Sequence, residues 1–211
     1  MKTSSELEED FFRGRSVDIA QDLLGKLIAV ENLAGRIVET EAYLGEKDPS
    51  CHLARNNEKR NRVFRKGAGT VYVFKIYQHH NMNFITEIDG YPEGVLIRAI
   101  EPVNGLEEMK DRREVEKDVL LGSGPGRLTQ ALGINREKDN GLSLTESRIN
   151  LYSDGSDPDI EVSRRIGISE AEEWPLRFSI SGNKHVSKPL DKDVNEGFEP
   201  KKFYNNIFSK K

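Results

Sequence analysis

The segment from Arg36 to Leu44 constrains the fold more than any other part of this sequence. Its Ile, Val, Thr and Tyr residues are typical of a β-strand. Side chains on a strand alternate between its two faces. One face, suited to a core, carries Val38, Thr40, Ala42 and Leu44, whereas the other carries Ile37, Glu39, Glu41 and Tyr43. A strand this apolar with two neighbouring carboxylates either borders a polar pocket or leaves one face in water.

Helical and extended patterns follow one another along the rest of the chain. Ser16 can cap a helix over residues 17–24, and Gly25 fits the end of that helix. A turn at 31–35 joins a strand at 26–30 to the opening segment as a hairpin. Further strands are expected at 70–76, 82–88, 95–100, 160–164 and 176–181, and further helices at 107–117 and 125–132, the last with Pro125 in its first turn.

This order of elements indicates the fold class. Scattered strands interleaved with helices predict an α+β fold with a mostly antiparallel sheet flanked by helices. The sequence contains no internal repeat and no low-complexity linker. We therefore expect a single domain over residues 1–211, with irregular tails at about 1–14 and about 188–211.

Composition narrows the class of protein. The chain has 211 residues, of which 36% are hydrophobic, but it lacks an apolar signal core and any run long enough to span a membrane. We therefore expect an intracellular protein without a membrane partner. Its single cysteine, Cys51, excludes an internal disulfide and a Cys-rich zinc site. A net charge of −4 argues weakly against a nucleic-acid partner, although the local distribution of charge matters more.

Two glutamates on the opening strand are candidates for chemistry. Glu39 and Glu41 are two residues apart, so their Cα atoms lie about 6.5 Å from each other. In a cleft they would suit a general base or a pair of metal ligands, whereas on an exposed face they would be solvated and idle. Tyr43 and His52, one aromatic and one titratable, favour the functional interpretation because they lie close in sequence. Cys51 is better explained as a small buried thiol than as a nucleophile.

A basic run follows the possible active loop. Arg55, Lys59, Arg60, Arg62, Arg65 and Lys66 occur in a loop-like segment with one acid, Glu58. Such a run usually forms a solvated face, but here it can equally hold phosphates beside the site.

The next strand ends on an aromatic residue. Tyr77 stands where the strand should turn, and an exposed ring at that place can stack on bases or wedge between them. Tyr72, within the strand, is assigned to the core. His79 and His80 are a poor signal for a metal because neighbouring strand residues point to opposite faces.

Several motifs occur together in a fixed order, and they are specific as a set: LLGKLIAV, GRIVETEAYLG followed by His52, RNR, GTVYVF, MN, LIRAIEP, GSGPGRLTQALGI, RIGI and WPLRF. Through them the chain resembles, from about Asp18 to Ser187, the alkyladenine (N-methylpurine) DNA glycosylases of base-excision repair. The resemblance implies a curved antiparallel sheet with a hairpin that protrudes into the DNA minor groove.

The resemblance also implies roles for individual residues. Glu41 matches the general base that activates water, and Arg98 matches the arginine that helps to hold this water. Tyr43 and His52 match residues that stack on the flipped base and hydrogen-bond to it. Three further positions match the opposing aromatic, the asparagine that disfavours guanine and the intercalating residue: Phe74, Asn83 and Tyr77.

Two departures from the family pattern concern the hairpin and the pocket. Phe74 stands where the best-known members have tyrosine, so the hydroxyl is missing. The loop between Tyr77 and Asn83 is one residue shorter than expected, and Gln78 replaces an expected glycine. These departures bear on substrate range, whereas the catalytic positions all match.

The implied activity is that of a monofunctional DNA glycosylase. It flips alkylated or deaminated purines out of duplex DNA and hydrolyses the N-glycosidic bond with an activated water, which leaves an abasic site. The implied partner is double-stranded DNA containing damaged purines, bound by a monomer without metal or other cofactor. In a prokaryotic source the protein would be cytoplasmic and nucleoid-associated. Four residues are expected to contact phosphates: Arg60, Arg62, Lys66 and Arg127, the last near a helix N-terminus.

Two other function classes stay open on the sequence alone. One is a metal-dependent nuclease with a magnesium site formed by Glu39, Glu41, Asp48 and His52. The other is a catalytically silent reader of damaged DNA. The preferred lesion also stays open among 3-methyladenine, 7-methylguanine, hypoxanthine and ethenoadenine.

Overall fold

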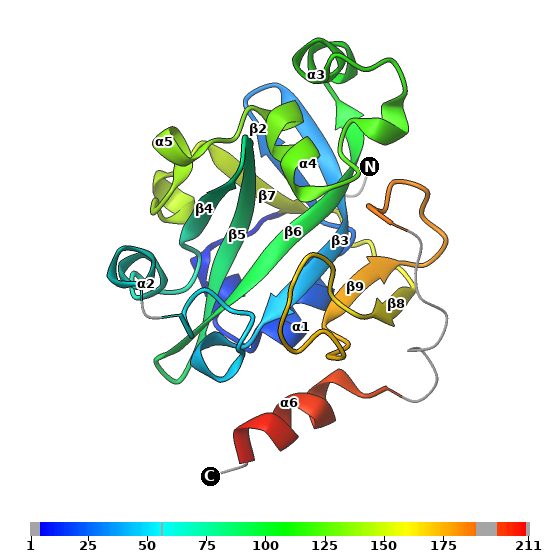
Figure 1. Cartoon of the computed structure of the whole chain (residues 1–211). Helices are drawn as coiled ribbons and strands as arrows, with labels where there is room; N and C mark the ends of the chain where they lie inside the picture. The colour runs from blue at the N-terminus through cyan, green and yellow to red at the C-terminus, as the bar shows by residue number, and fades with distance from the viewer. Residues whose placement is uncertain (1–4, 56, 189–197, 210–211) are drawn as a thin grey trace.

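A nine-stranded sheet forms the centre of the computed structural model of this chain, which describes residues 5–55, 57–188 and 198–209 (Figure 1). The main path of the sheet runs in the order β1-β7-β2-β3-β6-β5-β4, and β9 pairs with both β3 and β8. All of these pairings are antiparallel. The strands are β1 (Ser5–Glu6), β2 (Leu27–Val30), β3 (Leu33–Tyr43), β4 (Val71–Ile76), β5 (His79–Ile88), β6 (Tyr91–Asn104), β7 (Ile149–Ser153), β8 (Ile160–Ser163) and β9 (Arg177–Ile180).

Helices flank the sheet, which confirms the α+β class. The α-helices are α1 (Ser16–Asp22), α2 (Glu58–Phe64), α3 (Leu106–Arg113), α4 (Pro125–Leu132), α5 (Arg136–Asp139) and α6 (Pro200–Ser209). Helix α1 packs against β3 and β6, whereas α4 packs against β5 and β6. Helix α4 has the bounds expected from the sequence, because Pro125 suits its first turn and Gly133 ends it with a left-handed φ of 69°. None of the described helices combines the length and the apolar character needed to cross a membrane.

Strand β3 is buried on both faces. Strand β6 pairs along one edge of β3, and β2 and then β9 pair along the other. Glu39, Thr40 and Glu41 are all fully buried. The alternative of an exposed carboxylate face is therefore wrong.

Because of a bulge at Val38, Ile37 lies on the face of β3 opposite to the one expected from the sequence. The register with β6 shifts between Ile37 and Glu39. An extra residue in a strand moves the side chains before it to the opposite face. Ile37 consequently packs in the main core with Ala42 and Leu44, not beside the two glutamates.

The two expected hairpins have shorter turns than the sequence suggested. β2 and β3 are joined by Glu31 and Asn32 alone, because Leu33 and Ala34 already pair with Val30 and Ala29. Likewise, β4 and β5 are joined by Tyr77 and Gln78, since Ile76 pairs with His79.

Three expected irregular segments contain regular structure. The basic run is largely helical, because Phe64 packs into a second apolar cluster and anchors α2. Phe12, in the N-terminal segment, is fully buried at the end of a 3₁₀ turn (Glu9–Phe12). The C-terminal segment forms α6, whose Tyr204 is only 5% exposed.

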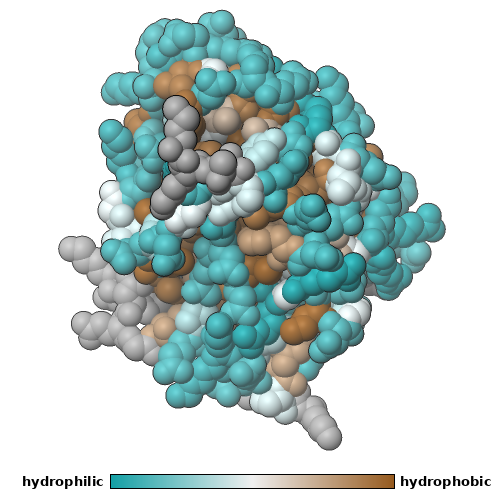
Figure 2. All heavy atoms as spheres, turned by 180° about the vertical axis from the view of Figure 1, so that it is seen from behind, coloured by the Kyte–Doolittle hydropathy of each residue, from teal (hydrophilic) through white to brown (hydrophobic). Residues whose placement is uncertain are grey.

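Figure 2, which views the chain from behind, shows hydrophilic residues over most of that face, with hydrophobic residues in scattered patches.

Candidate active site

A cavity of about 460 Å³ lies beside the carboxyl-terminal half of β3. Its walls come from β3, β4, β5, β6, the segment after β3 and the segment between β8 and β9, with one residue each from α2 and α4. The cavity brings together five of the residues expected at the site: Tyr43, His52, Phe74, Asn83 and Arg98. A volume of this order is typical of a small-molecule site.

Glu41 lies directly behind the wall of this cavity. Its side chain is fully buried, and both carboxylate oxygens are engaged. Oε1 accepts a hydrogen bond from the Ile166 backbone N–H at 2.7 Å, and Oε2 accepts one from the Tyr43 hydroxyl at 2.9 Å. Because Tyr43, Arg98 and Ile166 all line the cavity, Glu41 is one side chain away from its contents.

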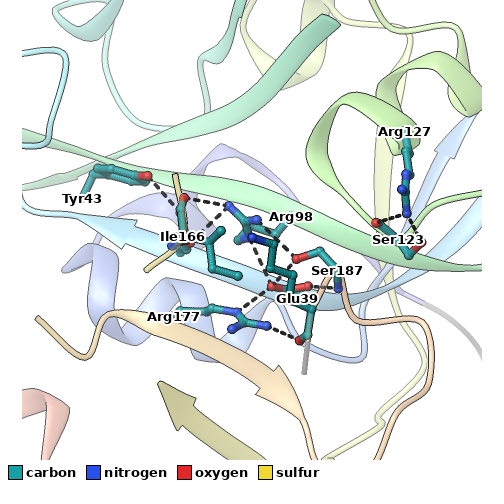
Figure 3. Close-up of polar contacts among 10 residues, drawn as sticks. Glu39, Tyr43, Arg98, Ser123, Arg127, Ile166, Arg177 and Ser187 are labelled. Atoms are coloured by element: carbon teal, nitrogen blue, oxygen red, sulfur yellow. Dashed lines mark hydrogen bonds and ion pairs between the residues drawn. The ribbon is translucent and has the colours of Figure 1, made fainter. Parts of the chain in front are cut away.

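Arg98 joins the two glutamates of β3, and Figure 3 shows its contact with Glu39. Its Nη1 lies 3.2 Å from Glu41 Oε1, and its Nε donates to Glu39 Oε1 at 3.1 Å. Burial by itself would lower the pKa of Arg98, but the carboxylates of Glu41 and Glu39 more than compensate, so that the pKa is raised. The guanidinium therefore stays charged, and a buried positive charge faces the cavity.

Glu39 is surrounded by hydrogen-bond donors from Arg177 in β9 and from Ser187, which follows β9. Its Oε1 accepts from Arg177 Nε at 2.7 Å and from the Ser187 hydroxyl at 2.9 Å, and its Oε2 accepts from the Ser187 N–H at 2.5 Å (Figure 3). Glu39 does not line the cavity. Its contacts hold Arg98 in place from behind.

The aromatic wall includes Tyr72, a residue that the sequence assigned to the core. Its hydroxyl is hydrogen-bonded to His52 Nδ1 at 2.9 Å, and its carbonyl accepts from Asn83 Nδ2 at 3.2 Å. The rings of His52 and Phe74 meet edge to face with centroids 4.5 Å apart. Tyr72 and Phe74 are two residues apart on β4 and therefore point to the same face. This spacing is the signal that could have placed Tyr72 at the site.

A buried ion pair behind Tyr43 has no signature in the sequence. The Arg165 guanidinium lies 4.7 Å from the centre of the Tyr43 ring and donates to both carboxylate oxygens of Asp48. Burial would lower the pKa of Arg165, but its hydrogen bonds to Asp48 and the charge of Asp48 raise it. The pKa of Tyr43 is raised well above its usual value by burial first and by the neighbouring Glu41 charge second. Tyr43 is therefore a neutral hydrogen-bond donor to Glu41.

Tyr77 stands apart from the cavity at the tip of the β4–β5 hairpin. Its side chain is 90% exposed, which agrees with the expected placement at a strand end. Its φ of 52° lies in the left-handed region, which is strained for a bulky side chain. The preceding residue, Ile76, lines the cavity, so the hairpin links the exposed ring to the pocket.

The four residues expected to contact phosphates come from two parts of the chain, α2 with the residues after it and α4. Arg62 is exposed and lies 3.5 Å from Glu58, its partner in the next turn of α2. Lys66 donates to the Gly141 carbonyl at 2.7 Å, and Arg127 donates to the Ser123 carbonyl and hydroxyl. Arg60 belongs to α2, but its side chain is outside the described part of the chain.

The four residues considered for a magnesium site already form ion pairs or hydrogen bonds with other side chains. Arg98 lies between Glu39 and Glu41, Arg165 neutralises Asp48, and His52 bonds to Tyr72. Among the residues that the structure describes, no group of three or more His, Cys, Asp or Glu side chains is placed to hold a metal ion. Cys51 is no nucleophile, because burial raises the pKa of its thiol to about 12.

Comparison with known proteins gives a consistent result. The family described as methylpurine-DNA glycosylase matches residues 10–184. A protein of Methanoculleus marisnigri is 42% identical over 84% of this chain and 96% of its own length. One from Francisella tularensis is 43% identical, over 85% of this chain and 97% of its own, and one from Prosthecochloris aestuarii is 41% identical, over 85% and 89%. All three carry the name "Putative 3-methyladenine DNA glycosylase".

Proposed function

This chain belongs to the methylpurine-DNA glycosylase family, and on that premise we propose how it removes damaged purines from DNA. It is a base-excision repair enzyme for alkylated purines and a hydrolase of N-glycosyl bonds. Its substrate in our proposal is duplex DNA with an alkylated or deaminated purine, bound by a monomer. In a prokaryotic cell it would act in the cytoplasm.

One observation carries the proposed mechanism: Glu41 is held by Tyr43, Arg98 and Ile166 behind a cavity of about 460 Å³, which has room for a purine. A carboxylate offers about four acceptor positions. Glu41 Oε1 uses two of them, for Ile166 and Arg98, whereas Oε2 uses one, for Tyr43. The remaining position on Oε2 would accept a hydrogen bond from the attacking water.

Base flipping supplies the substrate to this cavity. A purine inside a duplex is out of reach, so the enzyme has to extrude it at a cost of a few kcal/mol. The exposed ring of Tyr77 would fill the vacated space and offset part of that cost. The extruded base would lie against Tyr43 and the edge-to-face pair of His52 and Phe74.

The chemical step is a displacement at the anomeric carbon of the sugar. Glu41 takes a proton from the water, whose oxygen forms a bond to that carbon as the N-glycosidic bond breaks. The bonding electrons leave with the purine. A cationic alkylated purine departs as a neutral base, whereas a neutral deaminated purine would depart as an anion that takes up a proton from water. A positive charge on the purine also favours the aromatic walls. Arg98 would orient the water, and the product would be an abasic site in an uncut strand.

Two wall residues bear on specificity. Asn83 is held by its bond to the Tyr72 carbonyl, and in our proposal its amide opposes the exocyclic amino group of guanine. Phe74 offers only a stacking face, because it has no hydroxyl. Selection would therefore depend on shape and stacking at Phe74 and on hydrogen bonds at Tyr43 and His52.

Release of free base is the test of this function. Duplexes that each contain one defined lesion are incubated with the protein in the presence of a chelator, and free base and strand breaks are measured separately. We expect release of alkylated purines without strand breaks. Chelator-sensitive strand cleavage would indicate a nuclease instead, and tight lesion binding without release would indicate a silent reader.

A further inference from the structure

The helix α6 lies outside the family match, which ends at residue 184, yet it packs behind the candidate active site. In Figure 1 it lies beyond α1 at the end of the sheet opposite to α3. Its hydrophobic residues Phe203, Ile207 and Phe208 pack against the main core. Besides α1, it contacts the segment after β3 and the segment between β8 and β9, and each of these two segments also carries residues that line the cavity.

A buried hydrogen bond fixes α6 to the rest of the chain. The Tyr204 hydroxyl donates to Glu93 Oε1 at 2.7 Å, and Glu93 Oε2 accepts the Ser16 N–H at 2.7 Å. Glu93 is fully buried and Tyr204 nearly so. The Arg15 guanidinium lies 5.2 Å from the centre of the Tyr204 ring, which adds a second contact with the start of α1. A bond of this kind, closed off from water, is costly to break.

One side of α6 contacts the segment between β8 and β9. The Phe203 ring meets the Trp174 ring edge to face, with centroids 5.4 Å apart. The Arg165 guanidinium lies 5.8 Å from the centre of the Trp174 ring and 4.7 Å from the centre of the Tyr43 ring. The same segment carries Ile166, whose N–H holds Glu41. Contacts therefore run without a break from α6 to both Tyr43 and Glu41.

The end of α6 contacts the segment after β3. The Phe208 carbonyl accepts from Lys47 Nζ at 3.3 Å, and this ammonium lies 4.7 Å from the centre of the Phe208 ring. Phe208 also meets Tyr91 edge to face at 5.3 Å. The Tyr91 hydroxyl accepts from the Lys47 N–H and donates to the Leu44 carbonyl. Lys47 lies in sequence between Tyr43 and His52, so this contact is with the segment that joins two residues of the cavity wall.

We propose that α6 is a strap that positions the two cavity-forming segments, residues 44–52 and 164–176, for base excision. Phe203 and Trp174 are in this proposal positioning residues that act through Arg165 and Ile166. The expected effect on the rate of base release rests on the proposed function, whereas the expected effect on hydrogen exchange does not. Its physical basis is that a misplacement of about 1 Å far from the chemistry can cost about 10²-fold in rate.

The experiment uses the full chain with Phe203→Ala. We expect faster hydrogen exchange at the amides of residues 164–176, including Ile166. We also expect a single-turnover rate of base release, at saturating enzyme, about 10-fold or more below that of the wild type. Affinity for undamaged duplex should be unchanged, which a general loss of folded protein would not produce. Phe203→Leu should restore most of the rate, and Lys201→Gln, an exposed change on the same helix, should alter neither measurement.

Unchanged exchange at 164–176 together with an unchanged rate in folded Phe203→Ala would overturn the strap. If this variant does not fold, Tyr204→Phe carries the same test, because it removes only the hydroxyl that bonds to Glu93. There we expect faster exchange in both segments, 44–52 and 164–176, and no change would again overturn the proposal. Exchange needs no DNA, so absence of base release by the wild type would refute the proposed function without deciding on the strap.

Discussion

Arg98 and Glu39 form a buried ion pair in which Arg98 Nε donates to Glu39 Oε1 at 3.1 Å, and the same guanidinium also faces Glu41. The two side chains are 7% and 0% exposed. The two glutamates of β3 therefore contact the same arginine but have different roles. Glu39 holds the guanidinium from the side away from the cavity, whereas Glu41 contacts it directly behind the cavity wall, which Arg98 itself lines.

Substitution of the proposed base should separate chemistry from binding. Glu41→Gln keeps the shape of the side chain but cannot accept the proton of the water. We expect base release to fall by about 10²–10⁴-fold, with lesion-duplex affinity retained. The measurement is single-turnover release at neutral pH beside an equilibrium binding assay. Full release by this variant would refute the role of Glu41.

Substitution of Glu39 should mainly lower the stability of the folded protein. Glu39→Gln removes the charge that pairs with both Arg98 and Arg177. Breaking a buried pair by removing one partner costs about 3–5 kcal/mol, because the other charge stays buried. We expect a lower urea midpoint than for Glu41→Gln, along with reduced activity through misplacement of Arg98. Equal midpoints for the two variants would contradict the structural role of Glu39.

The hairpin tip offers a matched pair of substitutions. Both Tyr77→Ala and Tyr77→Gly remove the ring, but only glycine relieves the left-handed backbone, which costs other residues about 1–2 kcal/mol. We expect the two variants to lose excision equally, most for stably paired lesions such as hypoxanthine, because extrusion is then hardest. Glycine should be at least as stable as alanine by thermal unfolding. Equal activity of wild type and variants on paired lesions would remove Tyr77 from this role.

The cysteine should be inert in the native protein. Burial raises the pKa of the Cys51 thiol to about 12, so little of it is ionised near neutral pH, and the residue is 1% exposed. We expect a thiol reagent to modify Cys51 only as fast as the protein opens, and rapidly in denaturant. Base release should persist after prolonged treatment of the native protein. Fast native labelling with loss of activity would contradict the buried placement.

Duplex binding should depend on salt despite the net charge of −4. Each phosphate contact contributes about −0.9 to the slope of log affinity against log salt. Arg62→Gln should make this slope shallower by about one unit. Arg13→Gln, an exposed arginine outside the basic run, is the control and should leave the slope unchanged. Binding that does not respond to salt would exclude a basic docking surface.

Local patterns in the sequence predicted the parts of the site that depend on strand geometry. The two-residue spacing of Glu41 and Tyr43 determines that they share a face, and their hydroxyl–carboxylate bond of 2.9 Å agrees with this. The hairpin and its exposed Tyr77 also follow from local signals, since alternation ends where the chain must turn. Helix α4 follows from Pro125 and Gly133.

Only the tertiary structure decided which charges are paired and what covers the site. Arg177 reaches Glu39 across 138 residues of sequence, and Arg165 reaches Asp48 across 117. The bulge at Val38 places Ile37 in the core, and α6 docks through Tyr204 onto Glu93, which lies 111 residues earlier. Periodicity reports which face of one element is apolar, but the partner of a buried charge is chosen by packing between distant elements. Burial raises the cost of an unpaired charge, and this cost is set only when the sheet has formed.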